Sequence, residues 1–156
     1  MSEQHEDADH AIFSDQTNNE VLTMDSVTVN GSQAILSWQP STSEDAISYL
    51  IMYFDPGLGA YTAVDTIPIS TSLPYVWNSS VANTRPEQYV VVTLDSCGNQ
   101  SSELQATPLK SMHLSVNTDP CEGTTQLRWN NYLTFDGGAN YDVLVDIKDA
   151  QQNIVA

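Results

Sequence analysis

The fold is decided by residues 89–102, which read YVVVTLDSCGNQSS. The first six of these residues are almost all strand formers, and Tyr89 and Val91 fall on the same face of a strand. The tripeptide Cys97-Gly98-Asn99 then supplies the small and turn-tolerant residues that a tight reversal requires. The stretch therefore predicts a β-strand, a tight turn and the beginning of a returning strand.

Short strand-like runs alternate with turn signals on both sides of this stretch. We expect strands at residues 22–29, 33–39, 47–54, 61–67, 73–77, 89–94 and 103–107. No stretch of any length has helical periodicity, so the predicted fold class is all-β, with one complete β-sandwich domain over residues 21–107. Residues 1–20 are acidic and rich in amides, which predicts a flexible leader or linker.

The strand pattern begins again after residue 107, where residues 112–116 resemble the first strand. Leu127-Arg128-Trp129 repeats Leu36-Ser37-Trp38, and Tyr141-Asp142-Val143 repeats Tyr49-Leu50-Ile51. Tryptophan and tyrosine are 11 positions apart in the first copy and 12 in the second. This matched spacing predicts an internal repeat, with a partial second domain over residues 108–156. Half a sandwich exposes one inner sheet face, so either the chain is a fragment of a longer protein or another surface covers that face.

Acidic residues dominate the charge of the chain, since 20 of them face only 4 basic residues and give a net charge of −16. Nucleic-acid binding needs clustered Lys and Arg, so we expect no nucleic-acid partner. An anionic membrane surface is disfavoured for the same reason. No segment of about twenty apolar residues is present, so no membrane insertion is expected. Residues 1–9 are polar and acidic, unlike a signal peptide, so a secreted parent would hold this chain as an internal or mature piece.

Catalysis by an activated nucleophile would need a base placed beside it. The chain has three histidines, His5, His10 and His113. The first two lie among acidic residues of the leader, where they could meet a metal ion adventitiously, and His113 is expected on an exposed face of a linker strand. No Ser-His-Asp or Cys-His arrangement follows from these positions, so we predict that the chain is not an enzyme.

Acidic loop residues offer two further hypotheses. The Glu44-Asp45 loop and the turn from Asp95 to Asn99 are expected at the same pole of the sandwich. Their oxygens could hold Ca²⁺, or two of the carboxylates could act as a pair in glycoside hydrolysis. No dense acidic motif and no apolar surroundings accompany them, which favours ordinary solvated loop residues. We therefore predict no cofactor, with calcium as the alternative.

Three aromatic residues, Tyr61, Tyr75 and Trp77, allow a second kind of site. They could form a carbohydrate-stacking strip on one face of the sandwich. Aromatic residues in strands more often supply the core and the packing between domains, and we favour that role here.

The landmark residues resemble those of a fibronectin type III domain. The resemblance is carried by Leu36-x-Trp38, Tyr49-x-Ile51 and Tyr89-x-Val91 followed by Asp95-x-x-Gly98-Asn99-x-Ser101. It implies a core signature of Trp38, Tyr49 and Tyr89, repeated by Trp129 and Tyr141. It also implies that Tyr89 forms a tyrosine corner, whose hydroxyl ties the strand entry to nearby backbone. In place of the family's usual Leu-x-Pro before that tyrosine, this chain has VANTRP at residues 81–86.

A longer series of motifs resembles the tandem fibronectin-type region of large Bacteroidetes surface proteins. The motifs are Asp15-x-Thr17-Asn18-Asn19-Glu20, Trp38-x-Pro40-Ser41-x-Ser43-x-Asp45, Asp65-Thr66-Ile67, Asp95-Ser96-Cys97-Gly98-Asn99-x-Ser101 and Cys121…Leu127-x-Trp129-Asn130-x-Tyr132. In that family the region precedes a gliding-motility-associated C-terminal domain, which is used for export by type IX secretion. The resemblance implies a secreted or cell-surface location and neighbouring domains of the same polypeptide as partners.

The function implied by this resemblance is a non-enzymatic structural or adhesive spacer of a large secreted surface protein. Two alternatives stay open. The chain could be a module that binds a surface glycan or a protein, or it could be an accessory domain of a secreted hydrolase.

The family and the oxidising compartment it implies favour a disulfide between Cys97 and Cys121. The bond would close a loop of 24 positions and contribute about 3 kcal/mol through loop entropy. In a straight string of domains the two residues would lie about two domain lengths apart, far beyond the ~7 Å between Cα atoms that a disulfide allows. The bond therefore requires the second repeat to fold back beside the first, and otherwise the two thiols are unrelated.

Two triplets, Asp25-Ser26-Val27 and Asp65-Thr66-Ile67, resemble the acceptor sequence of Bacteroidetes O-glycosylation. The resemblance implies Ser26 and Thr66 as modification sites. Such triplets also arise by chance in strands rich in Ser and Thr, and this alternative stays open.

Overall fold

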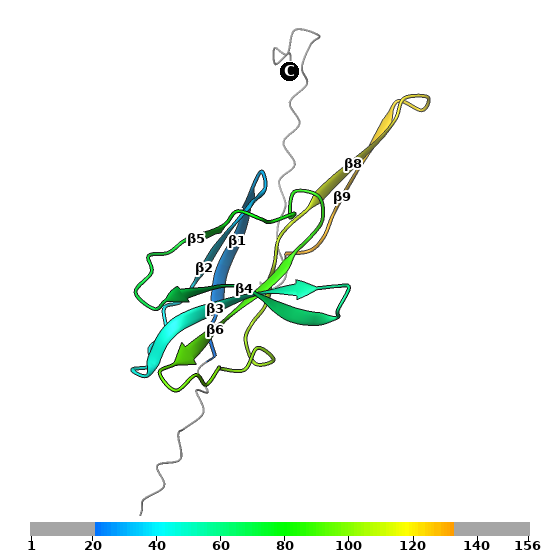
Figure 1. Cartoon of the computed structure of the whole chain (residues 1–156). Helices are drawn as coiled ribbons and strands as arrows, with labels where there is room; N and C mark the ends of the chain where they lie inside the picture. The colour runs from blue at the N-terminus through cyan, green and yellow to red at the C-terminus, as the bar shows by residue number, and fades with distance from the viewer. Residues whose placement is uncertain (1–20, 133–156) are drawn as a thin grey trace, which may run out of the picture.

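The computed structural model describes residues 21–132, which form an all-β structure of nine strands in three antiparallel sheets. The strands are β1 Met24–Asn30, β2 Gln33–Trp38, β3 Ala46–Asp55, β4 Ala60–Pro68, β5 Tyr75–Trp77, β6 Gln88–Asp95, β7 Leu109–Lys110, β8 Leu114–Asp119 and β9 Thr124–Trp129. Within residues 21–132 no helix is long and apolar enough to cross a membrane. The first seven strands form a β-sandwich, and β8 and β9 form a hairpin that projects from it (Figure 1).

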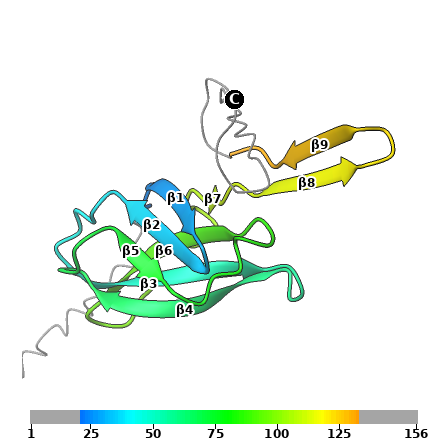
Figure 2. The same cartoon turned by 90° about the horizontal axis from the view of Figure 1, so that it is seen from above.

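The sandwich consists of a three-stranded sheet in the order β1-β2-β5 and a four-stranded sheet in the order β4-β3-β6-β7. Figure 2 shows the two sheets as separate layers, with the β8–β9 hairpin extending beyond both. Alternation places Ala34, Leu36 and Trp38 on the inner face of β2, as the period of a half-buried strand requires. The all-β sandwich expected from the sequence is confirmed at this level.

The core between the sheets is built around aromatic contacts. The rings of Trp38 and Tyr49 meet edge to face, with centroids 5.2 Å apart, and aromatic pairs favour this geometry. Tyr89 belongs to the same cluster and is fully buried. The buried members of the cluster are Leu22, Met24, Val27, Ala34, Leu36, Trp38, Tyr49, Ile51, Ile67, Tyr89, Val91 and Leu109.

Strand β6 is buried on both faces, which explains its uninterrupted run of valines. Val91 faces the core, whereas Val90 and Val92 pack with Met52 and Ala106 in a second cluster on the outer face of the four-stranded sheet. Ala106 reaches this face from the segment that follows β6. A strand buried on both faces is apolar throughout instead of alternating.

The prediction of a last strand at residues 103–107 is wrong, because the last strand of the sandwich is β7 at residues 109–110. The chain instead forms a turn at residues 102–106, in which the N–H groups of Gln105 and Ala106 donate to the carbonyl of Ser102. Strand pairing with β6 resumes only at Leu109 and Lys110. The turn carries Ala106 onto the outer cluster, and Pro108 has no N–H to donate to a ladder. Strand β8 likewise begins at residue 114 and not at residue 112.

Candidate functional site

The β8–β9 hairpin presents four apolar side chains on one face. Leu114 pairs with Trp129, and Val116 pairs with Leu127. Directly opposite partners lie on the same face of a sheet, and so do residues two apart in a strand. Leu114 is 51% exposed, Val116 58% and Trp129 38%. A contiguous exposed apolar face marks an interaction surface, and we call these four residues the hairpin face.

The hairpin face has the same register as the first two strands of the sandwich. In β1 and β2, Met24 pairs with Trp38, and Val27 pairs with Leu36. The corresponding pairs in the hairpin join Leu114 to Trp129 and Val116 to Leu127. The one difference is a bulge in β1, which adds a residue between its two inward positions. Apart from this bulge, the hairpin repeats the inward-facing pairs of β1 and β2.

The hairpin face and the inner face of β1 and β2 differ in burial. Met24, Val27, Leu36 and Trp38 are between 0% and 5% exposed, because β3 and β6 of the facing sheet cover them. The hairpin face carries side chains of the same kinds at much greater exposure. Tyr141, which the sequence predicts as the second-copy equivalent of Tyr49, lies outside the described residues.

The base of the hairpin is attached to the sandwich by specific hydrogen bonds. The Asn130 amide donates to the carbonyl of Ser111 at 2.9 Å and accepts the N–H of His113 at 2.8 Å. The N–H of Val27, in the edge strand β1, donates to the Tyr132 hydroxyl at 3.0 Å. These bonds join the linker, the hairpin and the sandwich. His113 therefore contributes its backbone to this junction, while His5 and His10 lie outside the described residues.

A buried carboxylate lies immediately before β6. Glu87 is 2% exposed and accepts hydrogen bonds from the Ser80 hydroxyl at 2.6 Å, the Val81 N–H at 3.2 Å and the Tyr89 hydroxyl. Burial, followed by this hydrogen bond to Glu87, raises the pKa of the Tyr89 phenol. The carboxylate is closed to solvent, so we assign it to the stability of the sandwich.

The resemblance predicts that the Tyr89 hydroxyl bonds to nearby backbone, but in the structure its partners are side chains. The hydroxyl donates to the Glu87 carboxylate and lies 3.4 Å from the Ser80 hydroxyl oxygen. Glu87 stands two residues before Tyr89 and places a carboxyl oxygen, in place of a backbone carbonyl, within reach of the Tyr89 hydroxyl. The contact to backbone is indirect, because Glu87 accepts the Val81 N–H.

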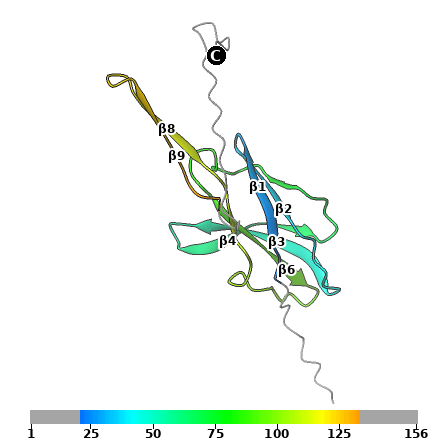
Figure 3. The same ribbon diagram turned by 180° about the vertical axis from the view of Figure 1, so that it is seen from behind.

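The expected disulfide between Cys97 and Cys121 does not form in the structure, where both thiols are exposed. Cys97 lies in the turn after β6, and Cys121 lies in the turn between β8 and β9. The hairpin projects away from the sandwich instead of folding back beside it, so its tip is far from the end of β6 (Figures 1 and 3). The two turns point in opposite directions, which is the geometry that rules out the bond in a straight string of domains.

The turn that holds Cys97 is organised by Asp95. Its carboxylate accepts the N–H of Cys97 at 2.9 Å, the N–H of Asn99 at 2.8 Å and the Asn99 side-chain amide at 2.9 Å. Gly98 takes the positive φ of 86° that closes the turn. The side-chain hydrogen bond from Asn99, and then the backbone N–H groups, hold the pKa of Asp95 below its usual value.

These bonds occupy the oxygens that the calcium hypothesis would use. Both oxygens of the Asp95 carboxylate accept protein donors, and Glu44 and Asp45 are exposed in the loop before β3. No group of three His, Cys, Asp or Glu side chains within residues 21–132 is arranged to hold a metal ion. The Asp95 carboxylate therefore organises the turn through its hydrogen bonds, and calcium binding stays an untested hypothesis.

Replacing Asp95 by asparagine is expected to flatten the acid side of the stability profile. The lowered folded pKa means that the contribution of Asp95 is fully present above the unfolded pKa, about 4, and is lost as the pH falls through the folded value. The measurement is the melting temperature between pH 7 and pH 2 for the wild type and D95N. The control is E122Q at an exposed position. Equal acid dependence in wild type and D95N would contradict the assignment.

The three candidate stacking aromatics do not form a strip. Trp77 packs against Tyr53 and Tyr89 at centroid distances of 6.0 and 5.8 Å, as part of the core. The Tyr75 hydroxyl donates to Asp65 at 2.7 Å, and burial together with this bond raises the pKa of Tyr75. Tyr61 lies on the other sheet, with its ring against Phe54. The structure thus supports core packing for these residues.

The two expected modification sites lie on different sheets. Ser26 is half-buried in the edge strand β1, whereas Thr66 is exposed on β4. The backbone N–H of Thr66 donates to the side-chain carboxylate of Asp65 at 2.8 Å, and the Thr66 hydroxyl takes no part in this bond. Of the two, Thr66 has the more accessible position for O-glycosylation.

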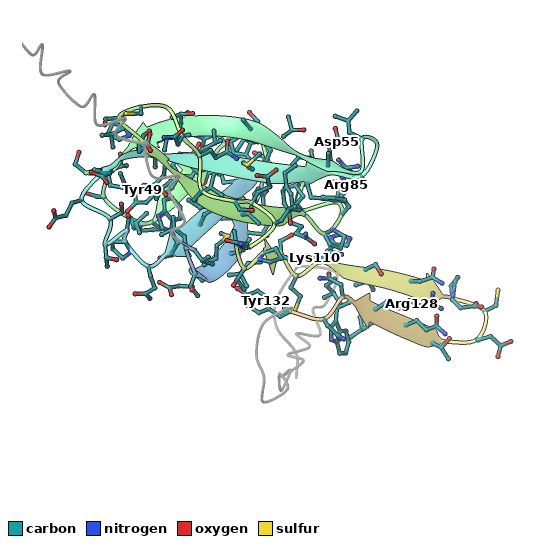
Figure 4. All side chains as sticks on the ribbon, turned by 90° about the horizontal axis from the view of Figure 1, so that it is seen from below. Tyr49, Asp55, Arg85, Lys110, Arg128 and Tyr132 are labelled. Atoms are coloured by element: carbon teal, nitrogen blue, oxygen red, sulfur yellow. The ribbon has the colours of Figure 1, made fainter. Side chains whose placement is uncertain are left out.

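A small pocket lies where the outer face of the four-stranded sheet meets the hairpin end of the sandwich. Its volume is about 170 Å³, and its lining is Tyr53, Phe54, Pro56, Pro86, Gln88 and Lys110. Arg85 stands at the rim and donates to the Tyr53 hydroxyl at 3.0 Å. Figure 4 shows Arg85 and Lys110 at the same end of the sandwich. Two of the three basic residues in the described part of this acidic chain therefore gather here.

Sequence reasoning missed this pocket because its residues come from three separate segments, 53–56, 86–88 and Lys110. The one signal in the sequence that could have pointed to this pocket is the scarcity of basic residues, because the position of each one restricts where an anionic ligand could bind.

No protein-family model, curated protein or solved structure matches this chain. Function is therefore inferred from the residues and their geometry.

Proposed function

We propose that the chain is a non-enzymatic spacer module, built from tandem β-sandwich repeats of the fibronectin type III kind, in a large secreted bacterial surface protein. The observation that carries this proposal is the hairpin face, because β8 and β9 repeat the register of β1 and β2. Seven antiparallel strands in two facing sheets support the family assignment. A second sandwich beginning where the first ends is the organisation of a tandem array.

A spacer must hold its shape between two attachment points. The described chain enters the sandwich at one end, and the hairpin leaves from the other (Figures 1 and 3). The Asn130 bonds to the linker and the Tyr132 bond to β1 give the junction a defined geometry. Extension along one axis with a hydrogen-bonded junction suits a module that keeps neighbouring domains apart.

The test is single-molecule stretching of the full chain held at its two ends. We expect one cooperative force peak from the first sandwich, which spans residues 22–109. Its unfolding should release roughly 30 nm of chain, since each extended residue adds about 3.5 Å. Smooth extension with no peak of this length would contradict a load-bearing role.

The second candidate function is binding of a carboxylated glycan, and the pocket at Lys110 favours it. Phe54, Pro56 and Pro86 offer apolar faces to a sugar ring, and Gln88 offers an amide. No carboxylate of the described residues forms an ion pair with the Lys110 ammonium, which can therefore meet the carboxylate of a uronic acid.

This candidate is tested by titrating the chain with a uronic-acid oligosaccharide and with its neutral counterpart. Preferential binding of the acidic sugar is expected, and K110Q should weaken it on the order of tenfold, the loss of one charge-assisted hydrogen bond. The matched control is R128Q, since Arg128 is a basic residue of the hairpin and lies outside the pocket. Equal binding of both sugars, or equal effects of the two variants, would count against the pocket.

A further inference from the structure

We propose that residues 141–147 of this same chain cover the hairpin face, with the Tyr141 ring against Trp129. The proposal rests on the internal repeat and not on the spacer role. The chemistry and the register of the surface to be covered are both defined by β8 and β9.

The first sandwich shows how such a face is covered. Trp38 is 1% exposed, and the ring of Tyr49, from the facing strand β3, packs against it in an edge-to-face pair with centroids 5.2 Å apart. Ile51 follows on the same face of β3 and is fully buried. Tyr49 and Ile51 cover Leu36 and Trp38. In the hairpin, Leu127 and Trp129 stand in the positions of Leu36 and Trp38.

The proposed occupant has the pattern of β3. Residues 141–147 read YDVLVDI, in which Tyr141, Val143, Val145 and Ile147 alternate with Asp142, Leu144 and Asp146. A strand with this alternation has one wholly apolar face. In the sequence, Tyr141 and Val143 correspond to Tyr49 and Ile51, and the spacing from tryptophan to tyrosine is only one residue longer than in the first copy.

Charge and area disfavour a second copy of the chain as the occupant. Each chain carries a net charge of −16, so two copies repel each other at close range. Four side chains on a two-stranded ribbon also fall short of the roughly 800 Å² per partner that stable interfaces bury. A segment tethered 12 positions from Trp129 avoids both obstacles, because its effective concentration is high.

Hydrogen exchange of the full chain, read by mass spectrometry, tests the proposal. We expect amides of residues 141–147 to be protected, and W129S to lower that protection at least tenfold. The control is R128S, the neighbouring position on the opposite face of β9, which should leave the protection unchanged. Protection of β6 must persist in both variants, which shows that the first sandwich stays folded.

Three outcomes would overturn the proposal. Residues 141–147 could exchange as fast as an unstructured peptide, or their protection could be the same in W129S and wild type. Protection that disappears on hundredfold dilution would instead identify a second copy as the occupant. A force peak from the first sandwich is independent of all three, so the spacer role and this inference can fail separately.

Discussion

Replacing Trp38 by alanine is expected to lower the free energy of unfolding of the first sandwich by about 3–5 kcal/mol, the cost of emptying a large aromatic site in a core. Trp38 is 1% exposed and packs between the sheets against Tyr49. The protein interior cannot collapse fully around so large a cavity. The measurement is urea unfolding followed by far-ultraviolet circular dichroism, which does not depend on the tryptophan that is removed.

Two variants serve as controls for this result. W129A makes the same chemical change on the hairpin face and should alter the unfolding of the first sandwich by less than about 0.5 kcal/mol, as remote exposed positions do. W38F should cost less than W38A, because the buried Trp38 indole N–H has no hydrogen-bond partner among residues 21–132 and its loss leaves nothing unsatisfied. Equal effects of W38A and W129A would show that the two sites belong to one cooperative core, and would contradict the assignment of Trp129 to a second copy.

Replacing Glu87 by alanine is expected to cost about 3 kcal/mol, because three donors lose their acceptor inside the core. The donors are the Ser80 hydroxyl, the Tyr89 hydroxyl and the Val81 N–H. Urea unfolding at pH 7 measures the change.

The graded control for Glu87 is E87Q. The glutamine keeps the oxygen that accepts the Ser80 and Tyr89 hydroxyls, but it places an NH2 group, which is a donor, opposite the Val81 N–H. It should fall between the wild type and E87A. E122A removes an exposed carboxylate and should be within about 0.5 kcal/mol of wild type. A value for E87A that matches E122A would mean that the buried network contributes nothing net to stability.

The alternation of β2 and the valine run of β6 were sufficient to predict the sandwich. Leu36 and Trp38 could be placed in the core because a half-buried strand repeats every two residues. The repeated Trp129 motif predicts a second copy, which stays a prediction, while the strand pairing expected for its first two strands is present in β8 and β9. These features are local in sequence, which is why a single sequence reveals them.

Other features depend on contacts that sequence does not display. Glu87 follows Pro86 and precedes Gln88, which is typical of a surface loop, yet its carboxylate lies in the core. A turn forms at residues 102–106 in place of the predicted strand, because it allows Ala106 to pack in the cluster on the outer face of the four-stranded sheet. Whether the disulfide could form depended on the direction of the hairpin. The pocket at Lys110 forms only where three separate segments of the chain meet. Each of these requires the tertiary arrangement.

The central claim is that this chain contains one β-sandwich followed by the beginning of a second. Nuclear Overhauser contacts between aromatic rings of the full chain test it most directly. We expect two separate sets of contacts within one molecule, one joining Trp38 to Tyr49 and the other joining Trp129 to Tyr141. Contacts for Trp38 and Tyr49 alone, with none between Trp129 and Tyr141 in the same molecule, would contradict it.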